Sequence, residues 1–138
     1  MGKVIHIKWD ENVSVGIPLF DKQHKKLYDI MNDFFNLLQN GSGIKKVLET
    51  MNELKEYTDI HFSSEEKIMQ EYGYEEYELH KLQHESFMSE LIQLQNNIVE
   101  NNIIPTIESM RYIFIWLEKH IKDSDIRYSE FMIEKGIW

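Results

Sequence analysis

The chain has 138 residues, of which 42% are hydrophobic and 28% charged, a composition that is typical of a folded globular domain and excludes a disordered segment. Its formal net charge of −9 repels phosphate backbones and anionic lipid headgroups, so we expect no nucleic-acid or membrane binding. Because cysteine is absent, disulfides and thiolate metal sites are excluded, and any metal must be held by nitrogen and oxygen ligands.

Glycine and proline are concentrated between long segments with helical periodicity, as in helices joined by short loops. After an irregular arm with Gly16 and Pro18, we expect helices over about 21–40, 44–72, 75–102 and from Pro105 to about 122, then a short amphipathic helix over 126–135. Apolar residues recur at alternating spacings of three and four, which places them on one face of each helix. The sequence therefore predicts an all-α, antiparallel up-down four-helix bundle with an irregular N-terminal arm and a short C-terminal helix.

Histidines interrupt the apolar face of every predicted helix. The inward polar residues are His24, then His61 with Glu65, then His80 with His84, and finally His120. A lone histidine on such a face is more often a hydrogen-bonded core residue, but five in register indicate a shared partner, because an unpaired buried polar group costs about 1–3 kcal/mol. Imidazole and carboxylate together suit iron, zinc, copper or manganese. Six or seven candidate ligands are too many for one ion and favour two ions bridged by carboxylates.

The spacing of these residues supports a shared site. His61 and Glu65 are four residues apart, as are His80 and His84, so each pair lies on one face of its helix. The last carboxylate is ambiguous. Asp125 lies about 140° round a regular helix from His120 and can join only if the helix bends or ends, so Asp123 is a rival.

Several stretches of the chain form a larger pattern that covers nearly all of it. They are Trp9-Asp10 with Ser14 to Ile17, Asp21 to Lys25, Tyr57-Thr58 with His61 to Glu66, His80 and His84 with Phe87, and Trp116 to Ile121 with Asp125. Taken jointly, these residues resemble the hemerythrin and bacteriohemerythrin family. The resemblance implies one hemerythrin-like domain over residues 1–138.

Matched position by position, the resemblance implies a complete set of ligands for two iron ions. His80, His84 and His120 would bind one iron, His24 and His61 the other, and Glu65 and Asp125 would bridge them. The five-residue spacing of the family selects Asp125 over Asp123. With an oxo or hydroxo bridge, this set leaves one coordination position open, on the two-histidine iron. The resemblance also implies that apolar side chains wall a dioxygen pocket, namely Leu27, Phe62, Trp116, Leu117 and Ile121.

The function that follows from the resemblance is reversible dioxygen binding at a non-haem di-iron centre, for oxygen storage, delivery or sensing, without catalytic residues. The alternatives are a di-iron redox enzyme that handles peroxide or nitric oxide, an iron-handling protein, or a helical interaction module whose histidines are merely buried. Ferritin-like chemistry is disfavoured because no Glu-x-x-His motif occurs. A protein that receives the oxygen is a further candidate partner, and the oligomeric state stays open.

Two expectations concern location and the neighbours of the ligands. Residues 1–10 lack the basic start and apolar run of a secretory signal, and no stretch approaches 18 uninterrupted apolar residues, so we expect a cytoplasmic protein without a membrane span. Glu66 and Asp123 lie beside candidate ligands but off the inward faces. We expect both to be solvated.

Overall fold

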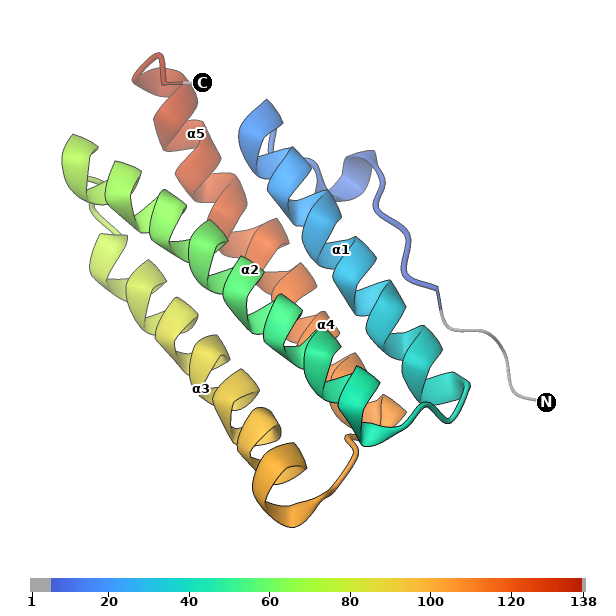
Figure 1. Ribbon diagram of the computed structural model, residues 1–138. Helices are drawn as coiled ribbons and strands as arrows, with labels where there is room; N and C mark the ends of the chain where they lie inside the picture. The colour runs from blue at the N-terminus through green and yellow to red at the C-terminus, as the bar shows by residue number, and fades with distance from the viewer. Residues whose placement is uncertain (1–5, 138) are drawn as a thin grey trace.

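The computed structural model describes residues 6–137, which form an up-down bundle of helices (Figure 1). The helices are α1 (Pro18–Gln39), α2 (Ile44–Tyr72), α3 (Tyr77–Asn101), α4 (Ile107–His120) and α5 (Ile126–Glu134). Five π-helical residues, Ile121–Asp125, join α4 to α5, so that these two helices form one continuous rod. From residue 6 onward, the N-terminal arm carries one short 3-10 turn, Glu11–Val13. The predicted fold class is confirmed.

The starts of three helices differ from the sequence expectation, and α3 begins at Tyr77 rather than near Glu75. α1 begins at Pro18, before the expected start at Asp21, because proline suits the first turn of a helix, where its missing N–H is not needed. α4 begins after Pro105 because Thr106 is its N-cap, with a side-chain oxygen that accepts from the backbone N–H of Ser109 at 3.1 Å. The expected bounds of α2 are confirmed.

The end of the fourth helix shows the largest difference from the expectation. The sequence predicts that it stops near Lys122, whereas the backbone continues through the π turn into α5. In this turn the N–H of Ile126 donates to the carbonyl of Ile121, five residues earlier. The wider turn carries Asp125 round to the side of His120, and its side chain is buried. The helix therefore does not need to end for Asp125 to reach the core.

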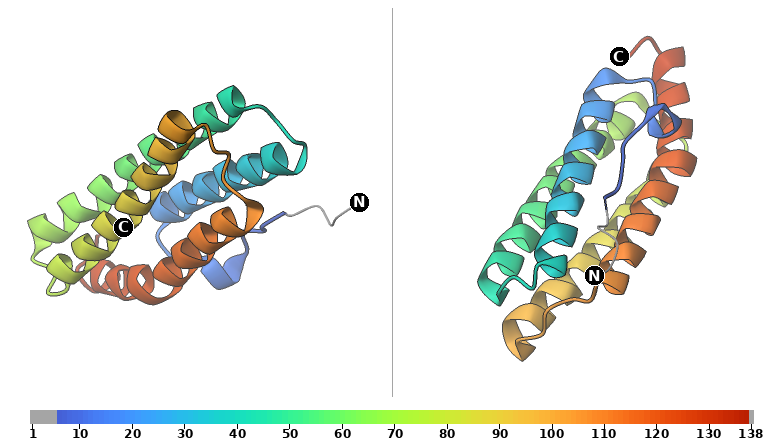
Figure 2. Two further views of the ribbon diagram at one scale, coloured as in Figure 1. Left: turned by 90° about the horizontal axis from the view of Figure 1, so that it is seen from below. Right: turned by 90° about the vertical axis from the view of Figure 1, so that its right-hand side faces the viewer.

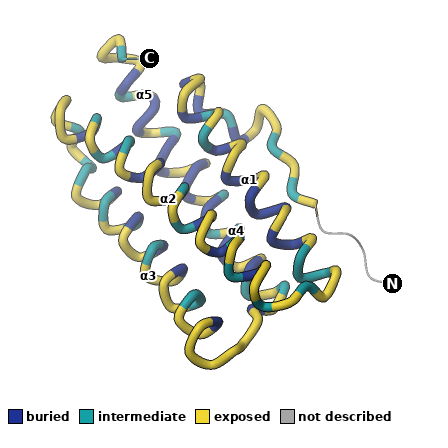
Figure 3. Tube along the Cα trace, viewed as in Figure 1, coloured by how far each residue is buried: buried dark blue, intermediate teal, exposed yellow. Residues whose placement is uncertain are grey.

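The core fills the space between the inward faces of the four long helices, which Figure 2 shows from two further directions. Buried residues follow one stripe along each helix, and the outer faces are exposed (Figure 3). Large aromatic side chains dominate the core, including Phe20, Tyr28, Phe34, Phe87 and Tyr128, each no more than 1% exposed. Burial of one such side chain contributes roughly 1.5–3 kcal/mol, so this core provides a rigid frame for polar residues within it.

The N-terminal arm lies along α1 and is attached at two points. The side-chain amide of Asn32 exchanges two hydrogen bonds with the backbone of Ile7, at 2.7 and 2.8 Å. Nearer the start of α1, the Asp21 carboxylate accepts from the Ser14 hydroxyl at 2.6 Å and from the Val15 backbone N–H at 2.8 Å. Asp21 thus fixes the arm, and it does not begin the helix. None of the described helices combines the length and the apolar character that crossing a membrane requires.

Candidate metal centre

All seven residues expected as metal ligands meet within the core, at one level of the bundle. Each is no more than 5% exposed. α1 contributes His24, α2 contributes His61 and Glu65, α3 contributes His80 and His84, α4 contributes His120, and the π turn contributes Asp125. The register of the four helices, which the apolar faces determine, therefore places five imidazoles and two carboxylates together.

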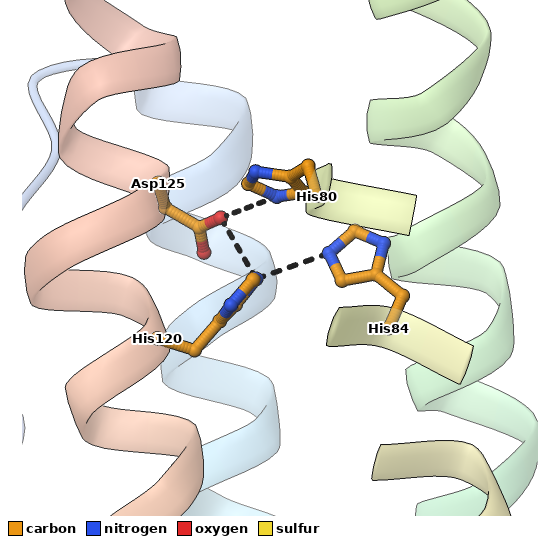
Figure 4. A group of neighbouring side chains, drawn as sticks. All are labelled: His80, His84, His120 and Asp125. Atoms are coloured by element: carbon orange, nitrogen blue, oxygen red, sulfur yellow. Dashed lines mark hydrogen bonds and ion pairs between the residues drawn. The ribbon is translucent and has the colours of Figure 1, made fainter. Parts of the chain in front are cut away.

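The first group of ligand atoms comes from α3, α4 and the π turn (Figure 4). One ligand atom from each of His80, His84, His120 and Asp125 lies within 4.8 Å of the others. Asp125 Oδ1 is 3.0 Å from His80 Nε2 and 3.2 Å from His120 Nε2. His84 Nε2 is 3.1 Å from His120 Nε2. Three ring nitrogens and one carboxylate oxygen thus surround one small space.

The second group comes from α1, α2 and the same aspartate. His24, His61 and Asp125 offer ligand atoms within 4.8 Å of one another, and Asp125 Oδ2 is 3.2 Å from His24 Nε2. The two oxygens of Asp125 therefore face different histidine groups. Glu65 also reaches both groups, because its Oε1 is 3.1 Å from His61 Nε2 and its Oε2 is 4.0 Å from His80 Nε2. Asp123, the rival carboxylate, is exposed.

The outer nitrogens of three histidines contact oxygen atoms on a neighbouring helix. His61 Nδ1 is 2.5 Å from Gln23 Oε1, His84 Nδ1 is 2.8 Å from Glu66 Oε2, and His120 Nδ1 is 2.9 Å from Gln83 Oε1. Since these oxygens can only accept, each Nδ1 carries the proton. In the neutral form of such a ring the inner Nε2 atom then has a free lone pair, which is the form that binds metals.

The expectation that Glu66 is solvated is wrong for its inner oxygen. Its side chain is 22% exposed, and its carboxylate bonds His84 on the next helix. The sequence reasoning also missed Gln23 and Gln83. All three residues are adjacent in sequence to a candidate ligand, so they point about 100° away from the inward face, toward a neighbouring helix. That adjacency is the signal that could have identified them.

The inner atoms of the cluster lack adequate partners among the described residues. His84 Nε2 and His120 Nε2 lie 3.1 Å apart, and in the neutral form of both rings with Nδ1 protonated their two lone pairs repel unless a cation lies between them. The inner nitrogens of His24, His61 and His80 and all four oxygens of Glu65 and Asp125 are buried without a hydrogen bond of good geometry. Leaving so many buried polar atoms unsatisfied is costly, and bound cations would satisfy them. The donor set fits metal ions that accept nitrogen and oxygen ligands.

Burial controls the protonation of the site. It lowers the pKa of His61 to about 4 and that of His84 far below its usual range, so both rings are neutral at pH 7. Burial also raises the pKa of Glu65 well above its usual value. For Asp125 burial acts in the same direction, but His120 and the contacts with His24 and His80 outweigh it and lower the pKa. The pKa values of the two carboxylates are thus shifted in opposite directions. A bound cation would displace any proton on Glu65.

Of the five residues expected to wall the dioxygen pocket, four are buried and two stack on candidate ligands. Leu27, Phe62, Leu117 and Ile121 are no more than 2% exposed. Phe62 stacks on His84, with ring centroids 3.7 Å apart. Trp116 is only half-buried. It stacks on His120 at 5.0 Å and lines a surface cavity of about 310 Å³ together with Lys119, Asp123 and Arg127.

Comparison with known proteins agrees with this arrangement. A family profile described as "Hemerythrin HHE cation binding domain" matches residues 15–129. The chain is 31% identical to a bacteriohemerythrin of Clostridium acetobutylicum over 87% of its own length and 96% of that protein. It is 32% identical to a myohemerythrin of Sipunculus nudus over 87% of its length and 88% of that protein. A crystal structure of wild-type hemerythrin superposes with a TM-score of 0.85 at 25% identity, covering 90% of this chain and 95% of that one. On the family profile and these relatives, the chain belongs to the hemerythrin family.

Proposed function

We propose that this protein binds dioxygen reversibly at a non-haem di-iron centre. His80, His84 and His120 would hold one iron, His24 and His61 the other, and Glu65 and Asp125 would bridge them. The observation that carries the proposal is the position of Asp125, whose Oδ1 faces His80 and His120 while its Oδ2 faces His24. A carboxylate with its two oxygens turned to two nitrogen groups is suited to bridging two ions.

When bound, the iron ions would supply the electrons for dioxygen binding, and an oxo or hydroxo bridge would complete the centre. The protein supplies an unequal set of donors, three imidazoles on one side and two on the other. That inequality leaves room for dioxygen beside His24 and His61. Neutral imidazoles also keep the positive charge of the site low, because burial prevents protonation of His61 and His84 at pH 7.

Reversibility requires that water be kept from the site, and the wall residues serve this purpose. Leu27, Leu117 and Ile121 are essentially inaccessible, and they present no polar atom that could carry water inward. Phe62 and Trp116 cover the rings of His84 and His120. These five side chains would form the pocket in which dioxygen is held.

The biological role that fits this site is oxygen storage, delivery or sensing by a binding protein, without catalysis. We place it in the cytoplasm as one hemerythrin-like domain over residues 1–138. A protein that accepts the released oxygen is the partner that delivery would require. The acidic charge of −9 argues against nucleic acid as a partner.

The test is to load the protein with iron, reduce it without air, and record visible absorption while oxygen is added and removed. Two irons per chain and a charge-transfer band that appears with oxygen and fades on its removal are the expected results. Two irons that oxidise irreversibly without the band would favour a redox enzyme acting on peroxide or nitric oxide, or iron handling. Failure to bind iron at all would favour a helical interaction module.

The bridging role of Glu65 has a natural control in the next residue. Glu65→Ala removes a group that reaches both histidine groups, whereas Glu66→Ala removes a contact to His84 alone. Iron analysis should show a much larger loss for Glu65→Ala. Equal iron contents in the two variants would refute the bridge.

A further inference from the structure

The outer contacts of the histidines follow one rule along the bundle. Gln23 on α1 bonds His61 on α2, Glu66 on α2 bonds His84 on α3, and Gln83 on α3 bonds His120 on α4. The supporting residue in each case stands beside a candidate ligand of its own helix and reaches a ligand of the next. The three contacts are alike in geometry but differ in charge, because two acceptors are neutral amides and one is a carboxylate.

The carboxylate acceptor affects its histidine more strongly than an amide does. An ionised oxygen draws the Nδ1 proton toward itself, which raises the electron density on the opposite nitrogen and makes it a stronger metal donor. Water can solvate Glu66, because it lies in a surface groove of about 480 Å³ between α2 and α3. Its carboxylate can therefore stay ionised while one oxygen remains 2.8 Å from His84 Nδ1.

Gln83, the amide that accepts from His120 in the same histidine group, is a weaker acceptor than Glu66 for a second reason. Gln83 Oε1 accepts from His120 Nδ1 at 2.9 Å and also from the Ser124 hydroxyl at 2.8 Å. The Gln83 oxygen is shared between two hydrogen-bond donors, so it polarises the His120 imidazole less. Ser124 is 6% exposed and belongs to the π turn that carries Asp125. His84 and His120 belong to the same group, but the Nε2 of His84 is the stronger metal donor.

We propose that Glu66 is a positioning residue. Acting through His84, it lowers the reduction potential of the iron that the three-histidine group would hold. Gln83 with Ser124 orients His120 through an acceptor that carries no charge. A stronger donor stabilises the oxidised ion more than the reduced one. The negative charge of Glu66 would therefore favour electron transfer to dioxygen from the iron in the three-histidine group. The inference rests on the proposed iron centre, and it extends that proposal by naming a residue that sets the reduction potential of the centre.

The decisive variants change the charge of an outer hydrogen-bond acceptor and keep the shape of its side chain. Glu66→Gln keeps an acceptor next to His84 and removes the charge, whereas Gln83→Glu adds a charge next to His120. We expect iron content to stay at the wild-type level in both, because the hydrogen bonds persist. Spectroelectrochemistry of the iron-loaded proteins should show that Glu66→Gln shifts the equilibrium toward the reduced form about tenfold, or about 59 mV for one electron. Gln83→Glu should shift it in the opposite direction.

Glu85→Gln is the matched control, since Glu85 lines the same groove and is not among the hydrogen-bond partners of a candidate ligand. It should leave the potential unchanged. Equal shifts for Glu85→Gln and Glu66→Gln would overturn the proposal, because the effect would then be one of general surface charge. Wild-type potential in Glu66→Gln would also overturn it and reduce Glu66 to a geometric support. Neither result depends on oxygen binding, so failure of the oxygen test would leave this inference separately decided.

Discussion

The three-histidine group and the two-histidine group of the centre are supported in different ways. The first has two aromatic rings stacked on its ligands and outer contacts from Glu66 and Gln83. Its ligands His84 and His120 also line surface cavities. In the second group, His61 has one amide contact and an edge contact with the Phe20 ring. His24 is fully buried, and within the described part of the chain neither of its ring nitrogens is hydrogen-bonded.

This difference indicates that the two halves are held for different purposes. Outer hydrogen bonds and stacked rings fix the tautomer and the orientation of a ligand, so the three-histidine half is the more firmly preorganised. In the other half, His24 is held by burial, by an edge contact with the ring of His61 and by the facing Asp125 carboxylate, without an outer hydrogen bond from the described residues. A half with fewer donors and a drier environment is the one suited to an exchangeable small ligand.

The largest expected effect comes from the residue that the two halves share. Asp125→Ala removes the carboxylate that faces both groups and leaves His24, His80 and His120 without their common partner. Iron content should fall from two per chain to one or less, as measured by elemental analysis of the purified protein. Asp123→Ala is the control and should retain both ions, because Asp123 is exposed. If the two variants lost iron equally, the π turn would have no role in presenting a ligand.

A smaller effect is expected when one half alone is damaged. His80→Ala leaves two imidazoles in its group, whereas His24→Ala leaves only His61. We therefore expect His24→Ala to lose one ion and His80→Ala to retain both with weaker binding. Competition titration with a chelator at increasing concentration would separate the two. Stronger retention in His24→Ala would reverse the assignment of the firmly held half.

The sequence predicted the bundle and six of the seven candidate ligands because both depend on helical periodicity. His61 with Glu65 and His80 with His84 occupy the spacing of one turn, and a regular helix leaves them no other arrangement. Asp125 could not be derived in this way. Its position depends on the π turn, which the residues from Ile121 to Asp125 do not signal locally, and only the family resemblance selected it.

The outer contacts were missed for a related reason. Gln23, Glu66 and Gln83 lie off the inward faces, where periodicity predicts solvent. Whether such a residue reaches a neighbouring helix depends on the distance and rotation between helices, which no single helix encodes. The capping of α4 by Thr106 was missed as well, since Pro105 gave a more obvious starting point.

A kinetic effect is expected where the three-histidine half meets the surface. Trp116→Leu removes the ring that stacks on His120 in the wall of the cavity beside Lys119, so water gains more access to this half. Autoxidation of the oxygenated protein, followed by the loss of its visible band, should accelerate several-fold while iron content is unchanged. Phe114→Leu is the matched control, because Phe114 packs on Tyr28 and not on a candidate ligand. Equal rates in the two variants would mean that Trp116 does not shield the site.

The smallest effect tests whether the arm contributes to the centre or only to the stability of the helix that carries His24. Asn32→Ala removes both hydrogen bonds to Ile7, which together stabilise the fold by about 2 kcal/mol. The urea midpoint should fall accordingly, whereas Asp33→Ala, at the exposed neighbouring position, should leave it unchanged. Iron content should stay at the wild-type level, because Asn32 lies two turns of α1 beyond His24. A loss of iron from Asn32→Ala would show that the two-histidine half depends on the arm, and burial of His24 alone would then be insufficient to hold it.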